Sequence, residues 1–269
     1  MGTGHRTRVP DRCPAPSAER SEVLINMPKL SIIIPCHNEE KHLPDALSSI
    51  ASQSFRDLEV IVPVRADTSD RTREIARDAG AWVMEGGDVV TGRNNGAARA
   101  AGDIFLFLDA DTKFPNESFL KDAVAEIEER KLGVAAPDVA TISDKWIDRF
   151  FFWIYSIYAR LTIYIHPHAP GFCMFATRKA HEGINGFDPE VPFAEDHDYI
   201  QRAKRAGFKV GILKTTKPIP TSDRRFKKDG RLRTACVYIW TDIRMFVYGP
   251  YRKKLPFTYE MGGDAPEKK

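Results

Sequence analysis

The segment Asp103-Ile-Phe-Leu-Phe-Leu-Asp-Ala-Asp111 indicates most clearly how this chain folds. Its apolar run, residues 104–108, is typical of a strand that is buried on both faces of a parallel sheet. Comparable runs at 30–35, 58–64 and 81–84 precede it, and segments with helical periodicity separate them. Strands that alternate with helices predict an α/β fold, in which a doubly wound, mostly parallel sheet carries helices on both faces.

Polar clusters follow three of these predicted strands at the point where each strand ends. They are Pro35-Cys-His37, Arg65-Ala-Asp67 and Asp109-Ala-Asp111. In an open parallel sheet, ligands bind beyond the carboxyl ends of the strands. We therefore expect the three clusters to meet in one crevice that binds a ligand.

The pair Asp109 and Asp111 has the chemistry of a metal site. Two carboxylates one residue apart can bind a hard cation such as Mg²⁺ or Mn²⁺, whose remaining oxygen ligands usually include substrate phosphates. In the alternative interpretation the pair belongs to a loop, and one Asp caps the following helix. Asn116, which follows Pro115, is the better candidate for that cap.

A second acidic cluster, Glu195-Asp-His-Asp198, begins a predicted helix at 195–206. The helix dipole favours acids at this end, so an ordinary helix start is one interpretation. Three acids within four positions nevertheless repel one another unless a cation or an acceptor proton lies nearby. A carboxylate beside a hydroxyl group can also act as a general base. We interpret His197 as a surface residue.

Composition limits the classes of function. The chain has 269 residues and a net charge of +3, which is too small to indicate nucleic-acid binding. Its four cysteines form no CxxC pair, which favours a reducing compartment over a disulfide or zinc framework. No apolar signal segment and no run of about 18 apolar residues is present. We therefore expect a cytoplasmic protein, located at the cytoplasmic face of the membrane if its acceptor is lipid-linked.

The chain divides into three parts. Residues 1–26 are rich in Gly, Pro, Arg and Ser and predict a disordered tail, 27–230 form the main domain, and 231–269 predict an amphipathic helical extension with a tail. The aromatic stretch from Trp146 to Ile165 predicts either a helix in a membrane interface or an internal helix over an acceptor cleft. Basic residues outnumber acidic residues between Lys214 and Lys254, which predicts a positive field there.

Taken in order, several segments resemble the family 2 glycosyltransferases of GT-A fold, over residues 29–226. The matching segments are SIIIPCHNEE (31–40), GRNNG (92–96), GDIFLFLDADT (102–112), GFDP (186–189) and AEDHD (194–198). The resemblance implies that 27–230 is a GT-A domain with a smaller antiparallel element on the acceptor side. It also implies metal-dependent, inverting transfer of a sugar from a UDP- or GDP-sugar to a hydroxyl or phosphate of a glycan or a lipid-linked acceptor.

The same resemblance implies roles for individual residues. Asp111 would be the direct metal ligand, Asp109 would face the ribose or a metal-bound water, and Asp196 would be the catalytic base. Three residues would line the nucleoside pocket, namely Pro35, His37 and Glu39. Two more, Arg93 and Asn94, would lie near the base and the phosphates.

Two departures from the family pattern matter. Where the family usually has Asp-Asp-Gly-Ser after the second strand, this chain has Arg65-Ala-Asp67-Thr68, so the acid that contacts uracil is missing unless Asp67 replaces it. Both UDP and GDP therefore stay open. The Gln-x-x-Arg-Trp segment of processive members is Gln201-Arg-Ala-Lys-Arg205 here, which favours one transfer per binding event. Arg224 and Arg225 would close over the site and contact phosphate, or else they are plain surface residues.

Two other classes of protein remain open at this point. A nucleotidyltransferase also places paired acids on an α/β sheet, but Pro35-Cys-His-Asn38 lacks the glycine-rich phosphate loop of that class. The second class is a catalytically inactive module that binds sugar nucleotides. The joint presence of Asp109, Asp111 and Asp196 argues against it. The aromatic stretch and the basic segment together favour a lipid-linked acceptor and a peripheral contact with the membrane.

Overall fold

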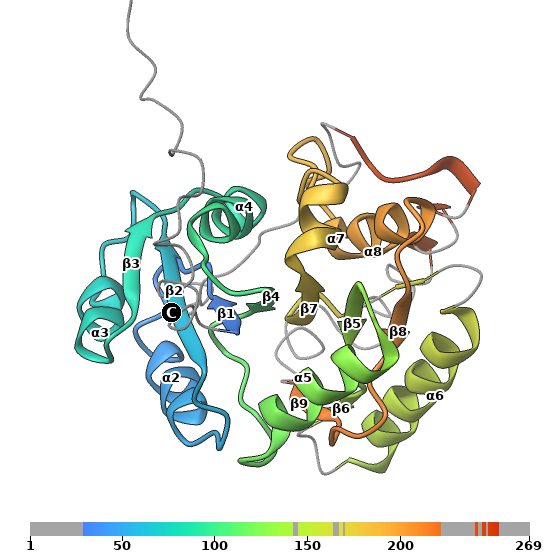
Figure 1. Ribbon diagram of the computed structural model, residues 1–269, viewed down its shortest axis with the longest axis horizontal. Coiled ribbons are helices and arrows are strands. Elements are labelled where there is room, and N and C mark those ends of the chain that lie inside the picture. Colours follow the sequence, from blue (N-terminus) through green and yellow to red (C-terminus); the bar gives the residue numbers. More distant parts are fainter. Residues whose placement is uncertain are drawn as a thin grey trace, which may run out of the picture.

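The computed structural model describes residues 29–141, 145–163, 167–168, 170–221, 240–241, 244–245 and 247–252. Within these residues, seven strands form one sheet in the order β3-β2-β1-β4-β7-β5-β8 (Figure 1). The strands are β1 (Leu30–Ile33), β2 (Leu58–Val64), β3 (Trp82–Glu85), β4 (Ile104–Leu108), β5 (Val134–Ala136), β7 (Cys173–Thr177) and β8 (Val210–Ile212).

The main sheet is parallel except at β7. The strands β1 to β4 pair in parallel, whereas β7 lies between β4 and β5 and is antiparallel to both. The register places Leu108 of β4 opposite Cys173 of β7. Every residue of β1 and β4 is buried, as their apolar sequences predict. The α/β class and the doubly wound, mostly parallel sheet are confirmed.

Helices cover both faces of this sheet, as expected. Alternate residues of β4 enter two separate cores, with Leu106 in one and Phe107 in the other. The first core is closed by α2, α3 and α5, and the second by α4, α7 and α8. The helices are α2 (Leu43–Ala51), α3 (Thr72–Asp78), α4 (Val89–Arg99), α5 (Phe119–Arg130), α6 (Trp146–Thr162), α7 (Arg178–Gly183) and α8 (Glu195–Arg205).

Two glycines allow α4 to lie close to the sheet. A Cβ atom added at Gly92 would lie 3.1 Å from Pro35 Cβ, and one added at Gly96 would lie 2.5 Å from Ile33 Cγ2. A larger side chain at Gly96 would therefore push the helix away from β1. Because α4 approaches so closely, Arg93, which lies between the two glycines, reaches the carboxyl edge of the sheet and is buried there.

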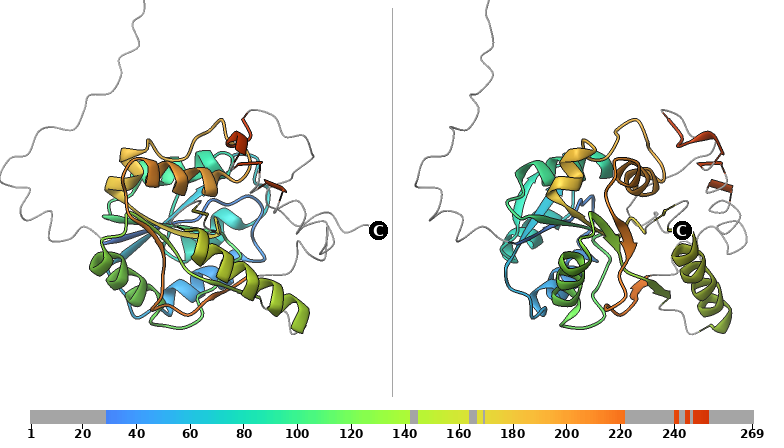
Figure 2. Two further views of the ribbon diagram at one scale, coloured as in Figure 1. Left: turned by 90° about the vertical axis from the view of Figure 1, so that its right-hand side faces the viewer. Right: turned by 45° about the vertical axis from the view of Figure 1, so that its right-hand side comes forward.

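A second, smaller sheet contains β6 (Val139–Thr141) and β9 (Ile219–Thr221), which pair in parallel. The helix α6 packs against β6 at the outer edge of the molecule (Figure 2). The structure thus differs from the expected smaller antiparallel element, because antiparallel pairing occurs at β7 inside the main sheet. The small sheet is parallel since β6 follows β5 and β9 follows β8, and those two strands are themselves parallel neighbours.

Neither Asn38 nor Asn116 occupies an N-cap position, because α2 has His42 and α5 has Ser118 there. Asn38 has a left-handed backbone (φ 54°) and its Oδ1 accepts a hydrogen bond from Ser69 N at 2.9 Å, so it ties two loops together instead of capping α2. Similarly, α5 begins at Phe119, with Ser118 at its N-cap position, and not after Asn116. The interpretation in which an acid of the 109–111 turn caps this helix is therefore wrong.

Several predictions fall on residues outside the described part of the chain. These are the tail 1–26, Arg224, Arg225 and most of the extension 231–269. Of that extension, residues 240–241, 244–245 and 247–248 are helical. Among the described residues, every helix is too short or too polar to span a bilayer.

Candidate active site

The turn after β4 is held against the segment that leads into β7. Asp109 N donates to Phe172 O at 2.9 Å, and Thr112 N donates to Asp109 O at 3.0 Å. These bonds fix the backbone of Asp109-Ala-Asp111 at the carboxyl edge of the sheet. The Asp109 side chain remains 43% exposed, so its carboxylate can still reach a ligand.

Arg93 joins this turn to the first turn of α8. Its Nη1 donates to Glu195 Oε1 at 2.9 Å, while Nη2 donates to Asp109 Oδ1 at 3.2 Å and to Gly171 O at 2.8 Å. The Arg93 side chain is only 2% exposed, and its guanidinium lies 5.2 Å from the ring centroid of Phe187. We call these four residues, Arg93, Asp109, Gly171 and Glu195, the Arg93 cluster.

The Arg93 cluster was only partly predictable. Arg93 and Asp109 stand in segments with a recognisable pattern, whereas Glu195, which is 102 residues away from Arg93 along the chain, carries no sign of this contact. The available signal was an arginine beside two glycines at helical spacing, because such glycines mark the face of α4 that contacts the sheet. An arginine on that face needs an acidic partner, since a buried charge is stable only when it is paired.

Negative charge dominates the electrostatics of this edge. The protein atoms around the Asp109 carboxylate displace part of its water and raise its pKa to about 6; Arg93 opposes this rise, whereas the charges of Asp111 and Asp196 add to it. Burial and the charge of Asp196 raise the pKa of Glu195 above its ordinary value, against the opposing effect of Arg93. Burial acts to lower the pKa of Arg93, but the neighbouring acids outweigh it and raise that pKa, so Arg93 stays cationic.

This surplus of acids suits a divalent cation that a ligand helps to bind. No group of three or more His, Cys, Asp or Glu side chains in the described part of the chain is arranged to hold a metal ion by itself. Asp109 and Asp111 could therefore contribute oxygen ligands only alongside groups from a substrate, such as phosphates.

Asp196 lies against the backbone of Gly171. A Cβ atom at Gly171 would come within 2.7 Å of Asp196 Oδ2, so only glycine leaves room for this carboxylate. The other oxygen, Oδ1, accepts a hydrogen bond from His197 N at 2.9 Å. Because Arg93 binds the carbonyl of the same Gly171, the structure brings Asp109 and Asp196 together around one short segment. His197 is partly buried here, and its ring centroid lies 5.5 Å from that of His168.

The ends of β1 and β2 bring His37 and Asp67 together. Nδ1 of His37 lies 3.4 Å from Thr68 Oγ1 and 3.5 Å from Asp67 Oδ1. Arg65 donates to Asp67 through Nε at 2.7 Å, and this contact lowers the pKa of Asp67 to about 2. Asp67 is therefore ionised and is positioned by its neighbour Arg65.

Two other predicted pocket residues lie near this point. Pro35 contacts α4 through Gly92, as described above. The backbone N–H of Glu39 donates to Thr72 Oγ1 at 2.8 Å, which fixes the loop after β1 against α3.

Asn94 makes contacts different from those of Arg93. Its Nδ2 donates to Phe187 O at 2.9 Å, and its Oδ1 accepts from Phe187 N at 2.8 Å. The preceding residue, Gly186, has φ +69°, and a Cβ atom there would lie 2.5 Å from Asn94 Oδ1. Both ends of the amide thus hold the turn at 186–187, which in turn places Phe187 beside Arg93. In this structure Asn94 positions the Arg93 cluster.

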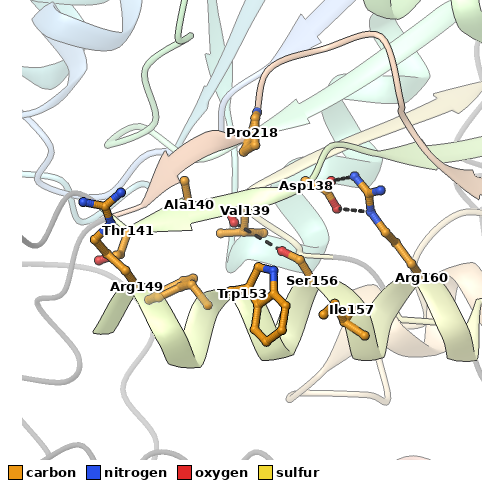
Figure 3. A pocket seen from close by; sticks show the side chains of 11 residues that line it. Asp138, Val139, Ala140, Thr141, Arg149, Trp153, Ser156, Ile157, Arg160 and Pro218 are labelled. Carbon is orange, nitrogen blue, oxygen red and sulfur yellow. Dashed lines mark hydrogen bonds and ion pairs between the residues drawn. The ribbon is translucent and has the colours of Figure 1, made fainter. Parts of the chain in front are cut away.

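A groove of about 550 Å³ lies between α6 and the small sheet (Figure 3). Arg160 of α6 forms an ion pair with Asp138, and Ser156 Oγ donates to Val139 O at 3.4 Å. Trp153 and Arg149 line the same groove. The helix therefore packs on the protein along one side, and its position in a membrane interface stays a prediction.

Comparison with known proteins shows the family of this chain, and the matched segment includes Arg93, Asp109 and Gly171 but ends before Glu195 and Asp196. The model of glycosyl transferase family 2 matches residues 31–184, which is more than half of the chain. The chain is 42% identical over 105 residues to 4,4'-diaponeurosporenoate glycosyltransferase of Staphylococcus haemolyticus, covering 34% of this chain and 26% of that protein. It is 30% identical over 201 residues to poly(ribitol-phosphate) beta-N-acetylglucosaminyltransferase TarS of Staphylococcus aureus, covering 70% of this chain and 34% of that protein. The chain thus spans about a quarter to a third of the length of these relatives.

Two solved structures share the fold. One is S. aureus TarS 1–349 in complex with UDP-GlcNAc, with a TM-score of 0.58 at 22% identity, covering 72% of this chain and 58% of that one. The other is the mannosyltransferase PcManGT from Pyrobaculum calidifontis in complex with GDP-Man and Mn²⁺. Its TM-score is 0.57 at 19% identity, covering 72% of this chain and 57% of that one.

Proposed function

Because the chain belongs to glycosyl transferase family 2, we propose that it transfers a sugar from a nucleoside diphosphate to an acceptor hydroxyl or phosphate, with inversion and one transfer per binding event. The observation that carries this proposal is the Arg93 cluster. It holds the turn with Asp109 and Asp111 next to the helix start with Asp196. Family membership also decides between the classes left open by the sequence, in favour of a glycosyltransferase over a nucleotidyltransferase.

The donor would be a UDP- or GDP-sugar bound across the carboxyl edge of the sheet. The flat ring of His37, the adjacent Asp67, Pro35 and Glu39 would receive the nucleoside. Solved neighbours of the same fold contain UDP-GlcNAc and GDP-Man, which supports a nucleotide-sugar donor but does not select the base. Arg224 and Arg225 remain candidates for contact with the donor phosphates.

Asp111 would be the direct ligand of Mg²⁺ or Mn²⁺, with Asp109 beside it. The fit rests on the surplus of acids over Arg93, which makes this edge attractive to a cation. When bound, the ion supplies positive charge that stabilises the leaving diphosphate. Arg93 would keep Asp109 at the carboxyl edge. Its positive charge would also reduce the repulsion among Asp109, Glu195 and Asp196.

Asp196 would act as the general base. Its carboxylate would take the proton of the acceptor group as the acceptor oxygen bonds to the anomeric carbon and the bond from that carbon to the diphosphate breaks. Attack from the side opposite the leaving group inverts the configuration of the anomeric carbon. Gly171 supports this role because any larger residue at that position would collide with Oδ2 of Asp196 and displace the carboxylate. The acceptor would be a glycan or a lipid-linked molecule.

A donor hydrolysis screen tests this function. The protein is incubated with UDP-, GDP- and dTDP-sugars, with Mn²⁺ or with EDTA, and the released nucleoside diphosphate is measured. We expect one nucleotide to be preferred and EDTA to stop hydrolysis. Binding of a donor without any hydrolysis or transfer would contradict the proposal and indicate an inactive module.

A further inference from the structure

The helix α6 exposes an apolar stripe along its whole length. Six large side chains belong to it, and they are Trp146, Phe150, Trp153, Ile154, Ile157 and Leu161. Their spacing keeps them on one face of a helix. Trp146 and Leu161, near the two ends, are 75% and 71% exposed. The opposite face of α6 contributes Ala159 to the buried interior. The exposed apolar side chains thus form one continuous side of an amphipathic helix and are not scattered singly over the surface.

Positive charge borders this stripe. Between residues 145 and 163 the sequence contains three cations, Lys145, Arg149 and Arg160, and one acid, Asp148. Arg149 and Arg160 line the groove together with Trp153 and Ile157 of the stripe, as Figure 3 shows. Arg160 is paired with Asp138, whose carboxylate belongs to the body of the protein. Lys145 and Arg149 are exposed.

A second apolar segment lies on the same side of the molecule. Figures 1 and 2 place the described parts of 240–252 on the side that carries α6. Three of their side chains are exposed, namely Trp240, Val247 and Tyr248. The Arg252 side chain, which is 51% exposed, is paired with Asp188 at 3.0 Å and with Glu190 at 3.3 Å, so this segment contributes apolar area and not net positive charge.

We propose that this side of the molecule is a docking surface for an anionic lipid bilayer, on which α6 lies flat at the level of the headgroups. Trp and Tyr favour that level, aliphatic side chains between them favour the acyl region, and bordering cations favour anionic lipid. With 17 residues and one face packed on β6, α6 fits a helix that lies on a membrane and does not cross it.

The docking surface also lies close to the proposed base. The ring of Tyr158 in α6 stacks on His168 at 4.9 Å between centroids, and His168 lies 5.5 Å from His197, the neighbour of Asp196. A docked protein would thus present its acceptor side to the bilayer surface. The inference rests on the proposed function only in this respect, since the docking surface itself is argued from exposure and charge.

Cosedimentation with vesicles tests the proposal. The probes are vesicles of phosphatidylcholine alone and of phosphatidylcholine with phosphatidylglycerol, at low and at physiological salt. We expect the full chain to bind the anionic vesicles more tightly, and salt to weaken that binding by screening. The double variant Trp146→Gln/Leu161→Gln should bind at least about tenfold more weakly because it loses apolar area. Arg149→Gln should lose about fivefold, the typical effect of one cation near anionic lipid.

Matched controls come from the opposite end of the molecule. Trp82 on β3 is 51% exposed, and Arg77 is exposed on α3, far from α6 in Figure 1. Trp82→Gln and Arg77→Gln should leave vesicle binding unchanged. Donor hydrolysis without vesicles should be the same in all of these variants and in the wild type, which shows that they are folded.

Three results would overturn the docking surface. The first is no binding to anionic vesicles at low salt, and the second is equal loss in the Trp82 and α6 variants. The third is a change in the sedimentation coefficient of the lipid-free protein when Trp146 and Leu161 are replaced, because it would make the stripe an interface between two copies. Vesicle binding without donor hydrolysis would instead refute the proposed function and leave the docking surface intact.

Discussion

Replacing Arg93 measures how strongly the buried charge pair stabilises the site. In Arg93→Met the chain retains a long side chain at this position, but Glu195 is left buried without its cation. Removing one partner of a buried pair in this way costs about 3–5 kcal/mol of unfolding free energy. Asp109 adds little to this cost, because its side chain is 43% exposed and water can replace the lost contact.

The variant Glu195→Gln separates pairing from packing. Its carboxamide carries no charge, so in this background Arg93→Met should cost only about 1–3 kcal/mol, the penalty for a buried polar group without a partner. The wild type, the two single variants and the double variant form a double-mutant cycle. Its coupling energy is then about 2 kcal/mol, within the range of residues in contact. Urea unfolding followed by circular dichroism gives the four free energies. Arg99→Met, at an exposed position of the same helix, is the control and should change stability by no more than about 0.5 kcal/mol.

A cycle without coupling would refute the charge pair. If Arg93→Met costs the same in both backgrounds, or no more than Arg99→Met, then Glu195 does not depend on Arg93. Donor hydrolysis adds a second readout. The double variant Arg93→Met/Glu195→Gln no longer contains an unpaired buried charge, but it still lacks the hydrogen bonds from Arg93 to Asp109 and to Gly171, so its hydrolysis should stay low. Full hydrolysis in the double variant would show that Arg93 does not position the turn.

Three further predictions concern the metal, the base and the stability at low pH. Asp111→Asn should abolish the stimulation of donor binding by Mn²⁺, whereas Asp103→Asn, at the exposed amino end of β4, should not; equal responses would exclude Asp111 as the ligand. Asp196→Asn should lower turnover by about 10² or more with donor affinity near wild type, and a collapse of affinity alone would make Asp196 a binding residue. Burial and the charges of Arg178 and Arg202 lower the pKa of His181 from 6.5 to about 4. The unfolded chain therefore binds this proton first as the pH falls, so His181 by itself contributes a loss of about 3 kcal/mol of stability between pH 6.5 and pH 4, while the raised pKa values of Asp109 and Glu195 act in the opposite direction. Urea unfolding at both ends of this window should show that His181→Gln loses less stability on acidification than the wild type, and an equal change in both proteins would contradict the assignment.

Those parts of the protein that depend on neighbouring residues can be predicted from the amino-acid sequence. Continuous apolar runs such as 104–108 predict buried strands, because each residue must be removed from water wherever the strand lies in the sheet. The clusters at 35–37, 65–67 and 109–111 then follow at strand ends. Their convergence at one edge was predictable since parallel strands share the direction of their carboxyl ends. The fold class and this edge of the site could therefore be predicted in advance.

Contacts between groups that are distant in the sequence become visible only in the folded protein. The antiparallel β7 enters between β4 and β5, Arg93 meets Glu195 across 102 residues, and Asn94 binds the backbone of Phe187. None of these contacts has a local pattern, because each depends on how long connections close when the cores form. The same holds for α6, whose periodicity shows that it has an apolar face. Only its packing on β6 decides that this face stays exposed, since a helix buries whichever side meets the rest of the protein.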